Sequence, residues 1–129
     1  MKLLLDTHAV IWLITGDERL PKRTKAIIEN KDNTSFVSIA SLWEMGIKHS
    51  LGKLNLKTGL SEIFDLIDES GLNLLSITPS HILTNTTLDF HNKDPFDRLI
   101  ISQAQCEGFT VDSKDGLFKN YKIKLLWEK

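Results

Sequence analysis

Short apolar runs alternate with helical segments along the whole chain, and this alternation restricts the fold more than any other feature of the sequence. Strands are expected at 2–6, 35–37, 72–77 and 109–111, with a last half-buried strand through Tyr121, Ile123, Leu125 and Trp127. Helices are expected at 9–14, 21–30, 39–50, 60–67, 80–86 and 96–107. This order is typical of an α/β fold, in which helices flank a central parallel sheet of about five strands as an α/β/α sandwich.

Turn-forming residues mark the ends of several of these segments. Pro21 and Pro95 stand near the starts of two helices, where the missing N–H of proline is tolerated. Asp94 precedes Pro95 and offers a capping side chain, and Gly52 suits the end of the helix at 39–50. The 129 residues contain no repeat, low-complexity tract or Pro/Gly-rich linker, so we expect one continuous domain over residues 1–129.

The composition favours a cytoplasmic protein without a membrane anchor. No apolar stretch approaches the ~18 residues of a membrane span, and Asp6 comes too early for a secretory signal. The single cysteine, Cys106, excludes an internal disulfide, and its apolar neighbours predict that it is buried. A net charge of −1 gives no basic surplus, so binding of nucleic acid would require a local basic patch or a bound metal.

Four acidic residues stand out because apolar sequence surrounds them or because they lie at expected strand ends and helix starts. They are Asp6, Glu44, Asp97 and Asp115. Ligands of parallel sheets bind beyond the carboxyl ends of the strands, and Asp6 and Asp115 are expected there. Together the four acids form an oxygen-rich set that suits Mg²⁺ or Mn²⁺.

Each of these acids also has a simpler explanation. Asp6 would cap a helix that begins near Thr7, and Glu44 would close a capping box if its helix began at Ser41. The helix dipole favours an acid in the first helical turn by ~0.3–1 kcal/mol, and this alone would account for an aspartate at position 97.

The last acid has a competitor as well as a simpler explanation. Turn chemistry alone accounts for Asp115 in the run Ser113-Lys114-Asp115-Gly116. Asp112 competes with Asp115 for the functional role. The case for a site therefore depends on the whole set of acids.

Other common site chemistries are disfavoured by the sequence. The four histidines have no metal-ligand spacing, which argues against zinc; they are His8, His49, His81 and His91. No glycine-rich phosphate loop or nucleophile elbow is present. A phosphatase of the haloacid-dehalogenase type needs a second Asp where His8 stands, and a receiver domain needs paired acids after the first strand, where Asp6 stands alone.

Four blocks of the sequence resemble, in order and spacing, the motifs of PIN domains of the VapC toxin family, and they span nearly the whole chain. The blocks are Leu4-Leu5-Asp6-Thr7-His8-Ala9-Val10-Ile11-Trp12, Ser38-Ile39-Ala40-Ser41-Leu42-Trp43-Glu44-Met45-Gly46-Ile47-Lys48, His91-Asn92-Lys93-Asp94-Pro95-Phe96-Asp97-Arg98-Leu99-Ile100-Ile101-Ser102-Gln103-Ala104 and Val111-Asp112-Ser113-Lys114-Asp115-Gly116-Leu117-Phe118. The resemblance implies a PIN-like fold and a ribonuclease acting as the toxin of a type II toxin–antitoxin system.

The resemblance also assigns the site. Asp6, Glu44 and Asp97 match the acidic triad of the family, and Asp115 matches its more variable fourth acid. Supporting positions are Thr7, Ser113 and Arg98. Asp112 departs from the pattern, since its position is usually apolar in the family.

By the same resemblance, Mg²⁺ or Mn²⁺ held by Asp6 and Asp97, with Glu44 and Asp115 completing the site, would support endonucleolytic cleavage of RNA. Hydrolysis of this kind leaves a 5′-phosphate and a 3′-hydroxyl. Cations near the acid blocks are expected to guide the RNA backbone; they are Lys48, His49, Lys53, Arg98 and Lys114.

The resemblance further implies a homodimer and a small VapB-like antitoxin, whose tail fills a groove beside the site. Trp12, Trp43 and Phe96 are candidates to line that groove, although core packing would also account for each of them. The alternative function is a catalytically weak PIN domain that serves RNA binding or assembly.

Overall fold

The computed structural model describes residues 1–54 and 58–126. In this part of the chain five strands form one parallel sheet in the order β3-β2-β1-β4-β5. The strands are β1 (Lys2–Leu5), β2 (Thr34–Ser38), β3 (Asn73–Leu75), β4 (Thr110–Asp112) and β5 (Lys124–Leu125). The predicted α/β fold with a parallel sheet is therefore confirmed.

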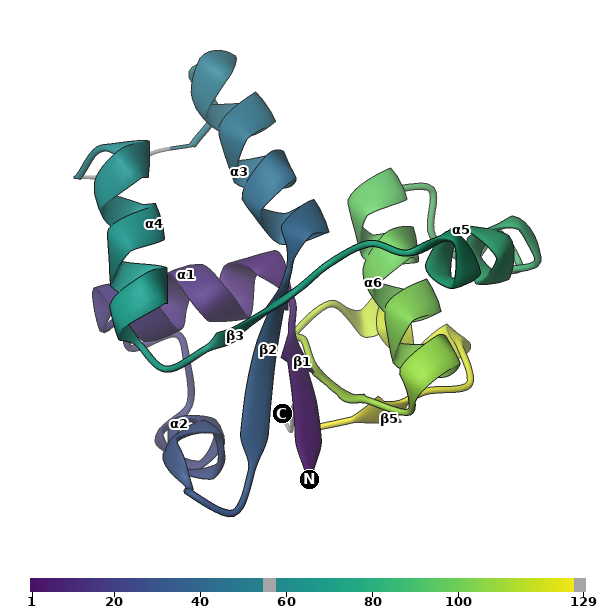
Figure 1. Cartoon of the computed structure of the whole chain (residues 1–129), viewed down its shortest axis with the longest axis horizontal. Coiled ribbons are helices and arrows are strands. Elements are labelled where there is room, and N and C mark those ends of the chain that lie inside the picture. The colour runs from purple at the N-terminus through teal and green to yellow at the C-terminus, as the bar shows by residue number, and fades with distance from the viewer. Residues whose placement is uncertain (55–57, 127–129) are drawn as a thin grey trace.

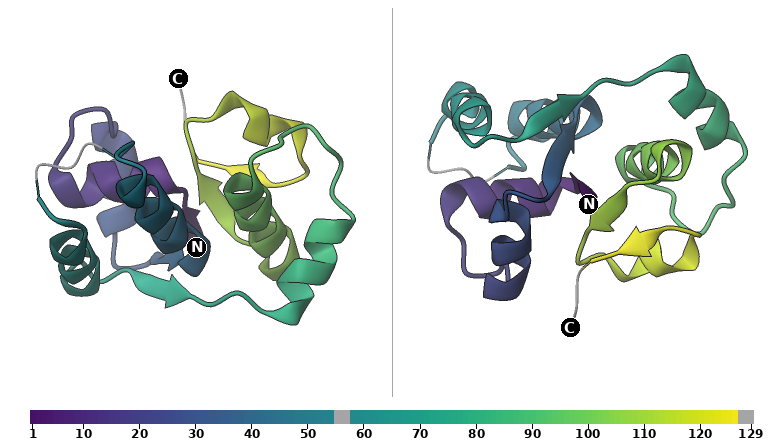
Figure 2. Two further views of the ribbon diagram at one scale, coloured as in Figure 1. Left: turned by 90° about the horizontal axis from the view of Figure 1, so that it is seen from above. Right: turned by 60° about the horizontal axis from the view of Figure 1, so that its bottom comes forward.

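Helices lie on both sides of this sheet, as Figures 1 and 2 show. They are α1 (Thr7–Thr15), α2 (Lys22–Glu29), α3 (Ile39–Ser50), α4 (Leu60–Glu69), α5 (Pro79–Thr86) and α6 (Pro95–Glu107), followed by the short 3₁₀ helix η1 (Gly116–Asn120). In Figure 1, α1, α2 and α4 lie to the left of β1 and β2, whereas α5 and α6 lie to the right. No helix in residues 1–54 and 58–126 has the length and apolar character that crossing a membrane requires.

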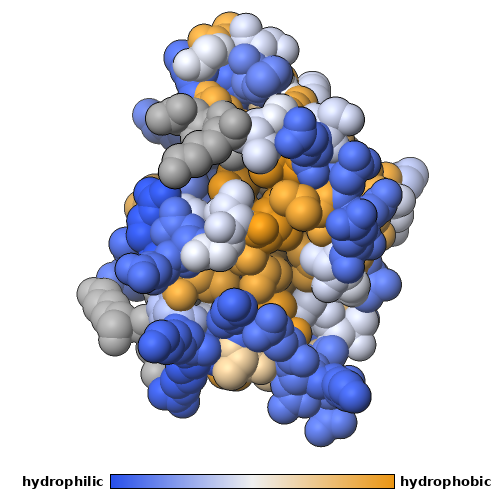
Figure 3. Space-filling view, turned by 90° about the vertical axis from the view of Figure 1, so that its left-hand side faces the viewer, coloured by the Kyte–Doolittle hydropathy of each residue, from blue (hydrophilic) through white to orange (hydrophobic). Residues whose placement is uncertain are grey.

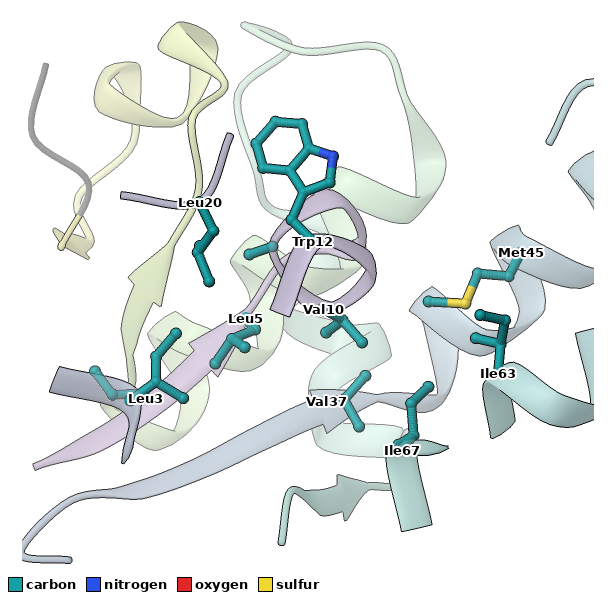
Figure 4. Packing of buried hydrophobic residues seen from close by; sticks show 11 residues of the cluster. Leu3, Leu5, Val10, Trp12, Leu20, Val37, Met45, Ile63 and Ile67 are labelled. Atoms are coloured by element: carbon teal, nitrogen blue, oxygen red, sulfur yellow. The ribbon is translucent and has the colours of Figure 1, made fainter. Parts of the chain in front are cut away.

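The central strand β1 supplies side chains to both layers because successive residues of a strand point to opposite faces. Leu3 and Leu5 belong to an apolar cluster that also includes Val10 of α1 and Met45 of α3; Figure 4 shows these side chains with other members of the cluster. Leu4 points the other way, into a second cluster that contains residues of α6, β4 and η1. With all three leucines fully buried, β1 is fixed in the middle of the molecule.

Three local expectations change. Cys106 is exposed and not buried, because the last turn of α6 lies at the surface before Gly108, whose φ of 75° ends the helix. The helix that carries Glu44 begins at Ile39 with Ser38 as its cap, so the capping box from Ser41 is wrong. The last strand is shorter than expected and covers Lys124–Leu125; Trp127, at the end of the expected strand, lies outside the described residues.

Candidate active site

One cleft of about 450 Å³ lies beyond the carboxyl end of β1, where residues of α1, α3 and the start of α6 meet the segment between β4 and η1. Its lining residues are Asp6, Thr7, His8, Trp12, Glu44, Lys48, Asp94, Asp97, Lys114 and Asp115. In Figure 1, β1 and β2 run upward side by side and α3 starts directly above β2. A hydrogen bond from Thr7 to Glu44 joins α3 to the segment that follows β1. The structure thus places all four acids chosen from the sequence around a single cleft.

Asp6 follows the last residue of β1 and is only 4% exposed. Its Oδ1 accepts a hydrogen bond of 2.9 Å from the N–H of Ala9, which makes Asp6 the cap of α1. Its Oδ2 accepts a hydrogen bond of 2.6 Å from Ser113 Oγ. Burial raises the pKa of Asp6 above its ordinary value despite these two bonds. The capping explanation and the site explanation therefore both hold for this residue.

Glu44 lies in the middle of α3 and is 3% exposed. Its Oε1 accepts a hydrogen bond of 2.6 Å from the hydroxyl of Thr7, which ties α3 to the start of α1. Its Oε2 pairs at 2.6 Å with Nζ of Lys48, one turn further along the helix. This hydrogen bond raises the pKa of Lys48, so a cation already lies against the buried carboxylate.

Asp97 stands in the first turn of α6, and Asp94 caps that helix by accepting from the N–H groups of Phe96 and Asp97. Burial, followed by the negative charge of Asp94, raises the pKa of Asp97 to about 7. The amide of Asn92 opposes this shift by donating a hydrogen bond of 3.3 Å to Asp97 Oδ2. Asp94 therefore lines the cleft and caps α6 at once.

Asp115, and not Asp112, lines the cleft. Asp115 caps η1, and its N–H donates to Oγ of Ser113, the same hydroxyl that donates to Asp6. Asp112 is fully buried, and neither of its carboxylate oxygens has a hydrogen-bond partner in the described structure. Burial, followed by the charge of Asp6, raises the pKa of Asp112 to about 7.

The basic residues divide into two groups. Lys48 and Lys114 line the cleft, whereas His49 and Lys53 do not. Arg98 is buried, and its guanidinium donates to four backbone carbonyls in the last turn of α5 and the loop that follows it, those of Asn85, Leu88, Asp89 and Asn92. The expectation that Arg98 guides an RNA backbone is therefore wrong, because its donors are used within the fold.

The sequence did not identify three residues of this region as site residues. They are His8 and Asp94, which line the cleft, and Asn92, which donates to Asp97 from outside it. His8 stands between Asp6 and the rest of α1, so its proximity to the acids was a usable signal. Asn92 had no such signal, because an asparagine in a loop is ordinary turn chemistry.

The donor set of the cleft fits a hard divalent cation. The carboxylates that line the cleft outnumber the lysines. Burial together with repulsion between carboxylates raises the pKa values of Asp6 and Asp97, so a bound cation would relieve this repulsion. Among the described residues, no three such side chains are already arranged to hold a metal ion. Lys48 and Thr7 already donate to the carboxylate of Glu44, and Ser113 donates to that of Asp6.

This charge arrangement predicts an unusual pH dependence of stability. A carboxyl group whose pKa rises on folding favours the folded state at low pH and opposes it as the pH rises. Because the pKa values of Asp6, Asp97 and Asp112 are raised, we expect the metal-free protein to melt at a lower temperature at pH 8 than at pH 5. Thermal melts across this range in EDTA measure the effect, and a melting temperature that climbs towards pH 8 would contradict it.

The same melts with added Mg²⁺ test the cation. A ligand at roughly 100 times its Kd stabilises by about 2.7 kcal/mol, and Mg²⁺ competes with protons for these carboxylates. The stabilisation should therefore be larger at pH 8 than at pH 5 and should be lost in Asp97→Asn. An equal shift in that variant would indicate non-specific ion binding.

The chain was compared with known proteins by sequence and by structure. A family model described as "PIN domain" matches residues 3–124. A comparison of the sequence with curated proteins gives no match.

Solved structures share the fold over nearly the full length. A chain of the VapBC2 complex from Rickettsia felis, bound to a DNA fragment from its promoter, is 22% identical with a TM-score of 0.75, covering 99% of this chain and 100% of that one. A chain of DNA-bound VapBC from Salmonella typhimurium is 19% identical with a TM-score of 0.69, covering 98% and 97%. A chain of FitAcB from Neisseria gonorrhoeae is 16% identical with a TM-score of 0.67, covering 95% of each.

The family match extends from the second residue of β1 to the first residue of β5, so it includes every strand and all four acids of the cleft. The chain belongs to the PIN-domain family.

Proposed function

We propose that this protein is an endoribonuclease dependent on Mg²⁺ or Mn²⁺ and that it acts as the toxin of a toxin–antitoxin pair. The main support is the gathering of Asp6, Glu44, Asp97 and Asp115 around one cleft in a PIN-domain protein. A cluster of carboxylates repels a phosphodiester unless positive charge neutralises it, so a bound cation is part of the proposal.

Each residue of the cleft has a part in this proposal. Asp6 and Asp97 would hold the cation, and Glu44 and Asp115 would complete the site. A bound divalent cation supplies polarisation of the scissile phosphate and a lower pKa for a bound water.

Other residues act on these acids or on the substrate. Ser113 and Thr7 orient carboxylates through the hydroxyl bonds to Asp6 and Glu44. Lys48 and Lys114, both at the cleft, would attract the RNA backbone. Arg98 supports the site from inside the fold by holding the loop before α6.

The proposed partner is a small VapB-like antitoxin, since several solved structures with this fold are VapBC or FitAB complexes. Trp12 lines the cleft, and Trp43 is 61% exposed with its ring packed edge-on against Phe96 at 5.5 Å. These aromatic rings would contact the antitoxin tail. A homodimer in the cytoplasm, where RNA is available, completes the proposal.

A second hollow lies apart from the cleft. Figure 3 shows an apolar area ringed by hydrophilic residues on the face that carries α1, α2 and α4. A hollow of about 570 Å³ beside these elements is lined by apolar residues such as Leu13 and Leu66 and by polar ones such as Asn30, Glu69 and Asn73. It includes none of the four acids of the cleft, so we assign it no catalytic part.

The deciding experiment is a cleavage assay on the purified chain with cellular RNA, with and without Mg²⁺. Metal-dependent cleavage, with 5′-phosphate ends mapped by sequencing, would support the nuclease, and growth arrest on expression of the chain alone would support the toxin. Undiminished cleavage in excess EDTA would contradict the metal-dependent mechanism. Tight RNA binding without cleavage would favour the alternative of a PIN domain used for binding or assembly.

A further inference from the structure

We propose that Asn92 is a positioning residue, which fixes the orientation of the Asp97 carboxylate for cation binding. The inference rests on the proposed function of the cleft, and it concerns a residue that does not line the cleft itself. It is supported by a continuous set of hydrogen bonds around the loop that leads into α6.

The side chain of Asn92 uses both ends of its amide. Nδ2 donates to Asp97 Oδ2 at 3.3 Å, and Oδ1 accepts from the N–H of Asp94 at 2.9 Å. The amide therefore connects the cap of α6 to the acid in its first turn. A carboxylate held in this way has one oxygen hydrogen-bonded to the amide, which restricts rotation of the carboxylate about χ2.

The backbone of Asn92 is held from two further directions. Its N–H donates to the hydroxyl of Tyr121 at 2.9 Å, and that hydroxyl donates to the carbonyl of Asp89 at 2.8 Å. Its carbonyl accepts from Arg98 Nη1 at 3.3 Å. With only 4% of its surface exposed, Asn92 cannot turn its amide towards solvent without breaking this set.

The residue type is also informative. Asp94 and Asp97 repel each other, which contributes to the raised pKa of Asp97. A neutral amide at position 92 donates to the carboxylate of Asp97 and accepts from the backbone N–H of Asp94 without adding charge. Loss of an outer partner that orients a metal ligand lowers metal affinity by roughly 10- to 100-fold, and we expect an effect of this size when the Asn92 side chain is removed.

The test is the affinity of the full-length protein for Mn²⁺, measured by isothermal titration calorimetry. Asn92→Ala should bind Mn²⁺ ~10- to 100-fold more weakly than the unmodified chain. Its affinity for RNA in EDTA should be unchanged, because Asn92 does not line the cleft. Asn92→Leu keeps a similar size and adds no charge but loses the donor to Asp97 and the acceptor of the Asp94 N–H, so it should be impaired as well.

Asn85→Ala is the matched control. Asn85 also donates one side-chain hydrogen bond, to Ser102 Oγ at 3.1 Å, but it does not lie at the cleft. A purely structural role would lower the melting temperature of both alanine variants and leave both Mn²⁺ affinities unchanged. If Asn92→Ala fails to fold, Asn92→Leu replaces it, because leucine fills a similar volume and still removes the donor to Asp97 Oδ2.

The outcomes separate the two proposals. Mn²⁺ binding by the unmodified chain together with equal binding by Asn92→Ala and Asn92→Leu would overturn the role of Asn92 and leave the nuclease proposal standing. Absence of Mn²⁺ and Mg²⁺ binding in the unmodified chain would overturn both. Weaker binding in the Asn92 variants with normal binding in Asn85→Ala is the result we expect.

Discussion

Asp97→Asn and Asp6→Asn should each reduce Mg²⁺-dependent RNA cleavage by more than ~100-fold, beyond the loss expected for an outer partner of a metal ligand. Each change keeps the shape of the side chain and removes one negative charge from the cleft. The change at Asp6 tests the site cleanly because asparagine caps helices about as well as aspartate, so α1 should remain intact. Initial cleavage rates at saturating Mg²⁺, with circular dichroism to check the fold, measure the effect.

Asp68→Asn serves as the control for these variants. Asp68 is an exposed acid on α4 and does not line the cleft, so its loss should leave the rate unchanged. Full activity of both the Asp6 and Asp97 variants would show that the cleft is not the nuclease site.

Asp112→Val should stabilise the folded protein by ~1–4 kcal/mol at pH 8, the range found when buried charged groups are replaced by apolar ones. Asp112 is fully buried without a hydrogen-bond partner, and it stands beside Leu5 in the register of β4 and β1. Strand neighbours in register point to the same face, so a valine would join the apolar cluster of Leu5. Urea unfolding of both proteins at several pH values measures the difference.

The sign of the pH effect follows from the pKa of Asp112. Folding raises it from 3.8 to about 7, so between these values the folded chain keeps a proton that the unfolded chain has released. Stability therefore falls as the pH rises through this range, and the gain from Asp112→Val should be largest above pH 7 and smallest near pH 4. Asp112→Asn removes the charge but leaves a buried amide, so it should recover only part of the gain.

RNA cleavage should survive in both Asp112 variants because Asp112 does not line the cleft. A destabilised Asp112→Val protein would show that the carboxylate has a favourable partner. Loss of cleavage with an intact fold would show that Asp112, and not only Asp115, acts in the site.

The sequence predicted the framework well because its signals are local. A buried strand that ends in an acid identified Asp6, and the pair Asp94-Pro95 located the start of α6 to within one residue. Asp6, Asp97 and Asp115 meet because they follow strand ends or lie at helix starts, whose positions in a parallel sheet are fixed by topology. Glu44 reaches the same cleft from the middle of α3.

Side-chain partners were not predictable in the same way. The pairing of Lys48 with Glu44 follows an ordinary i, i+4 spacing, but the sequence does not say that Glu44 is buried. Arg98 looked like a surface cation, and its burial depends on a loop whose path no local pattern determines. Cys106 was misjudged because apolar neighbours along a helix do not lie on the same face.

The bond between Ser113 and Asp6 joins residues that are 107 positions apart. During synthesis the first strand and its aspartate therefore emerge long before the strand and serine that complete their surroundings. Any nascent or truncated chain that stops before Thr110 lacks β4, Asp115 and the hydroxyl that donates to Asp6. The cleft therefore cannot assemble on a nascent chain until the segment with Ser113 and Asp115 has been synthesised.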